Sequence, residues 1–514
     1  MINIIEMLEK TAERYPDRVA FKDPAEEITF SELENNAKLI ANVFMDGSLD
    51  AVLEAGCPVA FYMEKCVKTM SVMLGAVYAG GFYSFIDVRQ PKERALSVLS
   101  VLQPSFVIAD KENMREAEEL RRLSNDSFVV VDITSFFGKI SGEKPAEEML
   151  GKRRKSFYDR MPLYVNFTSG STGIPKGVAI CHASVIEFIG TFTKTFGIQS
   201  SDIIANQAPF DFDVSVKDIY SGLYTGATVV IIPRDYFTNP TVLMDYLCDN
   251  NVTTLIWAVS AMCFVSIMNG LDYRTPDKLK RVMFSGEVMP VKQLNKWKKY
   301  LPQVTYINLY GPTEITCNCT YYILDREFEN EDNIPAGIPF ENEKVFLLDE
   351  NDKEVTKAGE EGEICVSGSC LALGYYRDRE KTDAAFVQNP LNDRFNEIIY
   401  RTGDIGKYDD EGRLLYVSRK DFQIKHLGQR IELGEIETYA GAADGVTRAC
   451  CIYEHDKKRI VLFYTGDSDK KELRNILLQK LPQYMIPGKI EQLSEFPLNK
   501  NGKIDRKRLI TDNK

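Results

Sequence analysis

Short apolar runs alternate with longer segments of helical spacing over the first part of the chain. Runs at 58–62, 106–109 and 128–131 lie between turn-forming residues and predict buried strands. Residues 1–10 place apolar side chains at helical spacing among acids, and the apolar residues 71–79 end at a Gly-Gly pair, so both segments predict helices. Strands that alternate with helices indicate a mostly parallel sheet.

The alternation continues past residue 160 and gives way near residue 341 to a strand-rich pattern. Before that point we expect helices at 183–196 and 291–300 and strands at 228–232, 254–257 and 305–308. After it we expect strands at 345–348, 363–367 and 414–417. The last stretch is patterned separately, with strands at 422–425, 449–453 and 460–464 and helices at 432–442 and 473–481.

These patterns predict an α/β fold in two domains. The large N-terminal domain, residues 1–420, would contain parallel-type sheets with flanking helices plus a β-rich subdomain. The small C-terminal domain, residues 421–514, would be α+β, with the boundary between Lys420 and Asp421. Two local expectations are more specific. Ser31 and Glu34 are spaced as a capping box, and the charged residues 144–160 suggest a solvated linker.

Composition and charge exclude several classes of protein. The 514 residues carry 63 Lys and Arg against 75 Asp and Glu, a net charge of −12, which argues against a nucleic-acid binder. Eleven cysteines without a CxxC pair suit reduced thiols better than a disulfide scaffold or a zinc site. No signal-peptide pattern opens the chain, and glycines interrupt its longest apolar stretch, residues 71–86. We therefore expect a cytoplasmic protein without stable membrane insertion.

A polar loop after an apolar run carries the first chemical signal. Glycines let the backbone approach a ligand, and hydroxyls, free N–H groups and a lysine suit a polyphosphate. The loop is not a Walker loop, because Pro175 replaces the second glycine and Gly177 follows the lysine where a Ser or Thr is needed. Its candidate phosphate-binding residues are Thr168, Ser169, Gly170, Ser171, Thr172, Gly173 and Lys176.

Five further stretches place polar residues at strand ends or in turns. Asp213 stands among apolar residues, where a carboxylate needs a partner; it could cap a helix or pair with a substrate ammonium. Tyr310 could stack on a base, and Glu314 could hold Mg²⁺ through oxygen. Asp404 suits paired ribose hydroxyls. The stretches are 212–216, 284–288, 308–314, 400–404 with 416–421, and 497–506.

Together and in this order, the six stretches resemble the adenylate-forming superfamily over almost the whole chain. Within it, the chain is most similar to amino-acid adenylation domains of nonribosomal peptide synthetases and to free-standing D-alanine–carrier-protein ligases. The Phe-Asp-x-Ser-Val element with Asp213 and the segment 421–437 with Gly428 and Arg430 carry this closer resemblance. A cytoplasmic AMP-forming ligase that uses ATP and Mg²⁺ is therefore expected.

The resemblance also implies roles for individual residues. The loop with Lys176 would hold the β- and γ-phosphates, Thr313 the α-phosphate and Glu314 the Mg²⁺. Lys503 would bridge the substrate carboxylate and the α-phosphate, and Lys420 and Asp421 would form the hinge of a mobile small domain. The adenosine would lie against Gly286, Glu287, Asn308, Leu309, Tyr310, Gly311, Pro312, Asp404, Tyr416 and Arg419. None of the three histidines, His182, His426 and His455, is expected to be catalytic.

The substrate would be an amino acid whose ammonium pairs with Asp213. We place D-alanine first, because Met283, Leu309 and Cys317 leave modest room. If Lys217 points into the pocket, its buried charge favours serine, aspartate or glutamate instead. The remaining pocket positions implied by the resemblance are Val214, Ser260, Ser285 and Asn318.

The resemblance further implies transfer of the aminoacyl group to a phosphopantetheine thiol. Because the chain ends soon after Arg508, we expect a separate carrier protein. We also expect a monomer. A basic cluster could dock an acidic carrier or be a solvated tail. Two other functions remain: an acyl-CoA ligase, against which Asp213 argues, and a non-catalytic binding protein. The basic cluster comprises Lys500, Lys503, Arg506, Lys507 and Arg508.

Overall fold

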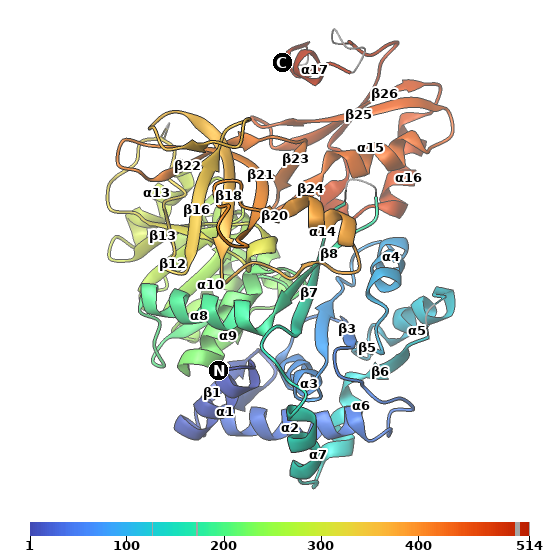
Figure 1. Ribbon diagram of the computed structural model, residues 1–514, viewed down its shortest axis with the longest axis vertical. Helices are drawn as coiled ribbons and strands as arrows, with labels where there is room; N and C mark the ends of the chain where they lie inside the picture. Colours follow the sequence, from blue (N-terminus) through green and yellow to red (C-terminus); the bar gives the residue numbers. More distant parts are fainter. Residues whose placement is uncertain (126, 171–172, 331, 499–503, 513–514) are drawn as a thin grey trace.

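The computed structural model describes all residues except 126, 171–172, 331, 499–503 and 513–514. Among these residues, the larger, N-terminal part contains three sheets, and the C-terminal part from residue 423 onward, which we call the small domain, contains two. In Figure 1 the small domain lies above the larger part. The α/β architecture with a β-rich subdomain and a small α+β domain agrees with the expected fold class.

Two mainly parallel sheets form the centre of the larger part. The strands of the nine-stranded sheet are β1 (Val19–Lys22), β2 (Glu27–Thr29), β9 (Ile203–Asn206), β10 (Thr228–Ile231), β11 (Thr254–Ala258), β12 (Arg281–Ser285), β13 (Thr305–Tyr310), β14 (Thr320–Ile323) and β15 (Ile338–Pro339). Those of the seven-stranded sheet are β3 (Pro58–Tyr62), β4 (Phe82–Phe85), β5 (Phe106–Ala109), β6 (Val129–Asp132), β7 (Pro162–Thr168), β8 (Lys176–Cys181) and β19 (Gly374–Tyr375). Their orders are β15-β14-β13-β12-β11-β9-β10-β1-β2 and β19-β8-β7-β4-β3-β5-β6.

Helices cover both faces of these sheets. The largest hydrophobic core joins the inner faces of both sheets to helices between them, and includes Phe44, Phe61, Phe188 and Tyr220. The helices of the larger part are α1 (Ile5–Arg14), α2 (Phe30–Met45), α3 (Val67–Tyr78), α4 (Lys92–Leu102), α5 (Met114–Leu123), α6 (Ile133–Ile140), α7 (Glu147–Arg154), α8 (His182–Phe196), α9 (Val214–Thr225), α10 (Pro240–Asp249), α11 (Val259–Ile267), α12 (Gly270–Tyr273), α13 (Val291–Tyr300) and α14 (Arg379–Ala385). Short 3₁₀ turns lie at Arg234–Thr238 and Thr313–Ile315.

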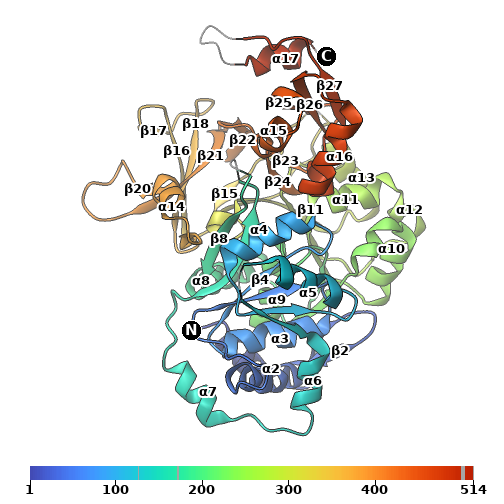
Figure 2. The same cartoon turned by 90° about the vertical axis from the view of Figure 1, so that its right-hand side faces the viewer.

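The third sheet and the small domain complete the fold. Figure 2 shows the third, antiparallel sheet on one side and α10 to α13 on the other, with the small domain above both. The third sheet contains β16 (Glu343–Leu348), β17 (Glu354–Val355), β18 (Glu361–Gly368), β20 (Phe386–Gln388), β21 (Ile398–Tyr408) and β22 (Leu414–Arg419). The small domain contains the hairpin β23 (Gln423–His426) and β24 (Gln429–Glu432), the sheet of β25 (Val446–Glu454), β26 (Arg459–Gly466) and β27 (Lys489–Gln492), the helices α15 (Leu433–Gly441), α16 (Lys470–Lys480) and α17 (Arg506–Asp512), and a 3₁₀ turn at Gln483–Met485.

Two local predictions were wrong. Helix α2 is capped by Thr29 and Glu32 rather than by Ser31 and Glu34, because burial of Phe30 starts the helix one residue after Thr29. Residues 144–160 are not merely a solvated linker, since they contain α7. Its acids lie in the first turn and its bases in the last, which complements the helix dipole, and Leu150 is buried in the main core.

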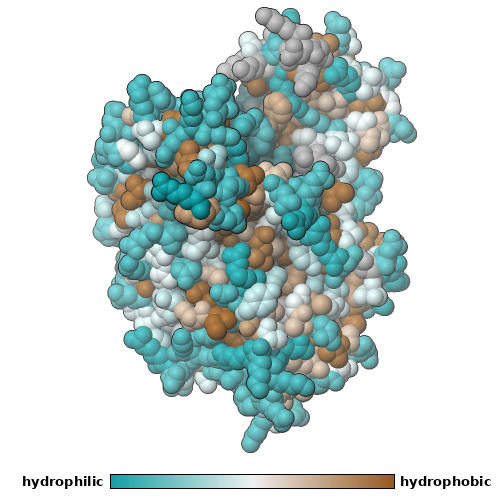
Figure 3. Space-filling model, viewed as in Figure 1, coloured by the Kyte–Doolittle hydropathy of each residue, from teal (hydrophilic) through white to brown (hydrophobic). Residues whose placement is uncertain are grey.

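The surface is largely polar on the face drawn in Figure 3, where hydrophobic residues occur in small groups among hydrophilic ones. No helix among the described residues is long and apolar enough to cross a membrane.

Candidate active site

The β23–β24 hairpin of the small domain lies between two cavities. The larger, of about 480 Å³, is lined by Tyr310 and Tyr416 of the larger part and by Lys425 of the hairpin. The smaller, of about 70 Å³, is lined by Asp213 of the larger part and by Arg430 of the hairpin. The hairpin therefore separates the two halves of the candidate site.

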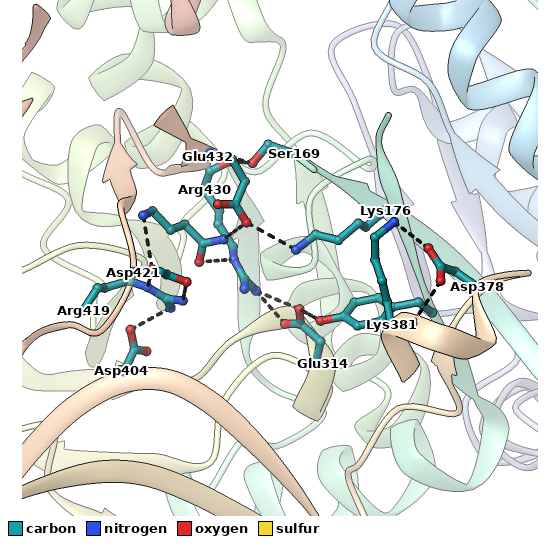
Figure 4. A network of polar contacts seen from close by, with 12 residues as sticks. Ser169, Lys176, Glu314, Asp378, Lys381, Asp404, Arg419, Asp421, Arg430 and Glu432 are labelled. Carbon is teal, nitrogen blue, oxygen red and sulfur yellow. Dashed lines mark hydrogen bonds and ion pairs between the residues drawn. The ribbon is translucent and has the colours of Figure 1, made fainter. Parts of the chain in front are cut away.

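The polar loop after β7 contacts this hairpin directly (Figure 4). The Ser169 hydroxyl donates to the carbonyl of Arg430 at 2.8 Å and accepts from the backbone N–H of Glu432 at 3.0 Å. Lys176, at the start of β8, forms an ion pair with Glu432 at 3.3 Å. Gly170 permits the tight turn, since a Cβ there would lie 2.0 Å from the Ile174 carbonyl oxygen. In this arrangement, groups of the small domain bind Ser169 and Lys176, two of the residues expected to bind phosphate.

Glu314 lies at the centre of the polar network in Figure 4. Its buried carboxylate accepts from Nη1 of Arg430 at 2.9 and 2.7 Å and from the Tyr375 hydroxyl at 2.9 Å. Burial would raise the pKa of Glu314, but the charges of Arg430 and Lys176 lower it to about 2. The carboxylate is therefore ionised at neutral pH.

The chemistry of Glu314 fits a hard cation. An ionised carboxylate is the kind of ligand that Mg²⁺ prefers, and Mg²⁺ usually takes one or two carboxylates plus substrate phosphates. The described residues contain no cluster of three or more His, Cys, Asp or Glu side chains that could hold a metal alone. Glu314 could thus serve a nucleotide-bound Mg²⁺, provided that Arg430 moves away.

The larger cavity brings together most of the residues expected around adenosine. Asp404 does not line it: its carboxylate accepts from the Tyr310 hydroxyl at 2.5 Å and from Nη1 of Arg419 at 2.8 Å. Gly311 and Pro312, which follow Tyr310 in the sequence, do not line it either. Expected adenosine residues that do line it are Gly286, Glu287, Asn308, Leu309, Tyr310, Tyr416 and Arg419.

Asp213 occupies the N-cap position of α9 without making a capping hydrogen bond. Burial raises the pKa of Asp213, while Thr313 and Lys217 oppose that rise. The simple capping interpretation of this acid therefore fails, and Asp213 lines the smaller cavity together with Thr313.

Two of the other expected pocket residues contact Lys217, which points inward. Lys217 is buried on α9, and its Nζ donates to Oδ1 of Asn318 at 2.7 Å and to Oγ of Ser285 at 3.4 Å. The Cys317 thiol donates to the Asp213 carbonyl at 3.1 Å. Val214, Met283 and Leu309 are also buried, whereas Ser260 lies beside the hairpin turn at Gly428.

Some of the expected residues cannot be placed in the site. Ser171, Thr172, Lys500 and Lys503 fall outside the described residues. In the expected basic cluster, Arg506 forms an ion pair with Glu437 and its guanidinium lies 3.6 Å from the centre of the Phe422 ring. Arg506 is therefore engaged by a small-domain residue and by Phe422, directly before that domain. His182 accepts the backbone N–H of Ile4 at 3.3 Å, a structural contact.

Sequence reasoning did not assign the hairpin side chains. Arg430 binds Glu314, Glu432 binds Lys176, and the Nζ of Lys425 lies 5.5 Å from the centre of the Tyr310 ring. The only signal was that segment 421–437 is typical of amino-acid activators. Tyr375 was missed too, because it comes from β19, far along the chain from its partner Glu314.

Comparisons with known proteins show the family of the chain. Residues 8–376 match the family described as AMP-binding enzyme, and residues 435–503 match its C-terminal domain. The chain is 30% identical to a D-alanine–D-alanyl carrier protein ligase of Bacillus cytotoxicus, over 99% of both proteins. It is 29% identical to tyrocidine synthase 1 of Brevibacillus parabrevis over 99% of this chain, but spans only 45% of that protein.

A solved structure shows the same fold. The adenylation domain AlmE of Vibrio cholerae, in complex with glycyl-adenosine-5′-phosphate, superposes with a TM-score of 0.83 at 21% identity. The match covers 100% of this chain and 98% of AlmE. With its two family matches and its full-length relative, the chain belongs to the AMP-binding enzyme family, the adenylate-forming superfamily that its motifs resemble.

Proposed function

We propose that the protein is an AMP-forming ligase that activates an amino acid with ATP. The observation that carries this proposal is the position of Asp213, a buried carboxylate without a capping bond that lines a cavity together with Thr313 and the Ser169 loop. An acid in that place suits an α-ammonium beside the phosphates. An acyl-CoA ligase has no such cation to bind.

The first half-reaction joins two anions. The substrate carboxylate attacks the α-phosphorus of ATP, so the negative charge must be screened. Mg²⁺ held by Glu314 and the nucleotide phosphates would supply part of that screening. Lys176 and Ser169 hold the departing phosphates, Thr313 contacts the α-phosphate, and Lys503 bridges the two reacting groups. No general base is needed, because the carboxylate is already ionised.

The second half-reaction transfers the aminoacyl group to the phosphopantetheine thiol of a carrier protein. We assign the described orientation of the small domain to this step. In support, Arg430 occupies both oxygens of Glu314, and Glu432 holds Lys176, so the charges that serve ATP are paired with small-domain residues instead. The small domain would rotate about Lys420 and Asp421 between the two steps.

The orientation of Lys217 changes the ranking of substrates. D-alanine came first because the pocket leaves modest room, while an inward Lys217 was expected to favour serine, aspartate or glutamate. Because its amine is buried against Asn318 and Ser285, we now favour a polar side chain over alanine. D-alanine remains the comparison substrate, since the full-length relative from B. cytotoxicus is named for it.

ATP–pyrophosphate exchange with all amino acids, in both enantiomers, tests the proposal. We expect exchange that depends on one amino acid or a narrow set of them. A protein that exchanges with no amino acid would not have this function. Loading of a phosphopantetheinylated carrier should follow, whereas thioester formation with free CoA alone would identify an acyl-CoA ligase.

A further inference from the structure

Lys217 is a buried basic residue. Its side chain is only 1% exposed, and its amine forms no ion pair among the residues that the structure describes. Its neighbours Asn318 and Ser285 are uncharged. Burying an ammonium in this way is costly unless an anion reaches it.

Two nearby acids do not provide a lasting counter-charge for Lys217. Asp218 accepts a hydrogen bond from Asn206 at 2.8 Å, and burial raises the pKa of Asp218 to about 8, so this group is mostly protonated near neutral pH. Asp213 is the other acid. In the proposed function it receives the substrate ammonium, which leaves Lys217 without a counter-charge once the substrate is bound.

The groups around Lys217 are held firmly in place. Thr316 and Cys317 have φ values of 53° and 81°, in the left-handed region that residues other than glycine rarely adopt. This turn places Asn318 against Lys217, and the Cys317 thiol ties it to the Asp213 carbonyl. Ser285 ends β12 directly before Gly286, which lines the larger cavity. The amine of Lys217 is therefore anchored close to the proposed nucleotide site.

We infer that the amino-acid substrate carries a side-chain carboxylate, as aspartate or glutamate do. This inference rests on the proposed function. The α-ammonium would pair with Asp213, and the side-chain carboxylate would bind Lys217, with the Ser285 hydroxyl beside it. Asp213 is the N-cap residue of α9 and Lys217 follows it by four residues, so their Cβ atoms lie about 6 Å apart, a distance that a short acidic side chain can span.

Smaller neutral substrates would leave the site incomplete. Neither enantiomer of alanine has a group that could reach Lys217, so the buried ammonium would stay unpaired. Sites built around a buried polar partner reject analogues that lack the matching group by factors well above those of apolar pockets. Lys217 would thus select for the acid and against alanine.

ATP–pyrophosphate exchange with all amino acids, measured on the unmodified protein, tests the inference. We expect kcat/KM for aspartate or glutamate to exceed that for D-alanine and L-alanine by at least about 100-fold. Exchange with an uncharged amino acid as the best substrate would overturn this inference and leave the proposed function standing. Absence of exchange with every amino acid would overturn the proposed function itself.

The variant Lys217→Met removes the charge at similar length. Its kcat/KM for the acidic substrate should fall by about 100-fold or more, mainly through KM, while its KM for ATP stays within about threefold of the original. The matched control Lys68→Met, at a surface lysine paired with Glu26, should keep the preference. Unchanged selectivity in Lys217→Met would contradict the inference. If that variant fails to fold, the panel on the unmodified protein still decides.

Discussion

Nη1 of Arg430, on the hairpin of the small domain, donates to both carboxylate oxygens of Glu314 in the larger part, at 2.9 and 2.7 Å. Glu314 is fully buried and is the residue that we expect to hold Mg²⁺. Because the positive charge of Arg430 lies against both oxygens, the ion pair would disfavour a metal ion at this carboxylate. On the proposed function, the pair would link the position of the small domain to the occupancy of the nucleotide site.

Arg430→Ala should separate the two half-reactions. Loss of one partner from a buried ion pair costs about 3–5 kcal/mol, which disfavours the described orientation. We expect carrier loading from preformed aminoacyl-AMP to slow at least about tenfold, with ATP–pyrophosphate exchange within about threefold of the original. Arg430→Lys keeps the charge, so its rate of carrier loading should lie between those of the original protein and Arg430→Ala. Equal loss of both activities would contradict this role.

A second ion pair, between the small domain and α4, should also stabilise the described orientation of the small domain. Arg94 and Glu435 are 7% and 0% exposed, whereas the neighbouring pair Lys480–Glu93 is 34% and 57% exposed. Exposed pairs contribute about 0–1 kcal/mol. We expect Arg94→Ala to slow carrier loading and Lys480→Ala to leave it nearly unchanged, measured in single-turnover transfer. Similar rates in the two variants would contradict a role of the buried pair.

Much of the fold could be predicted from local patterns, because strands and helices follow from the spacing of apolar residues. The strand at Phe106–Ala109 and the helix at Val291–Tyr300 lie where the sequence places them. The start of α2 was misplaced because two overlapping capping patterns exist and burial of Phe30 chooses between them. Sequence alone could not make that choice.

The site could be predicted by residue type but not by pairing. Arg430 and Glu314 are 116 residues apart, and their contact depends on how two domains pack. Likewise, Lys217 points toward Ser285 at the end of β12 and Asn318 after the turn, two residues far from it in the sequence. Chain-local patterns carry no information on either contact.

Asp213→Asn should affect the amino acid and not the nucleotide. The amide keeps the shape of the buried side chain but removes the charge that would pair with the ammonium. We expect KM for the amino acid to rise by about tenfold or more, since charged hydrogen bonds contribute about 1.5–3 kcal/mol. KM for ATP should change little in the same exchange assay. Equal increases would show that the acid is structural.

His182 should make the larger part sensitive to acid. Burial lowers the pKa of His182 to about 3, against about 6.5 in an unfolded chain. Between these values only the unfolded state binds the proton, so the free energy of unfolding falls as the pH falls. Between pH 7.5 and 5.5 this one group should cost about 1.4 kcal/mol.

Urea unfolding followed by the fluorescence of the buried Trp257 and Trp297 measures this effect. The variant His182→Asn removes the titrating group and can still accept the N–H of Ile4. We expect it to lose about 1.4 kcal/mol less stability than the unmodified protein over the same pH interval. Identical losses in both proteins would assign the acid sensitivity to other groups.

Lys503→Ala should give the reverse of the Arg430 pattern. Lys503 is expected to neutralise the reacting carboxylate and α-phosphate only during adenylation, so its loss should reduce ATP–pyrophosphate exchange by at least about 100-fold. Carrier loading from supplied aminoacyl-AMP should remain, and ATP binding measured by calorimetry should change little. Lys507→Ala, four residues further on, serves as the control. Near-normal exchange in Lys503→Ala would mean that another cation performs this step.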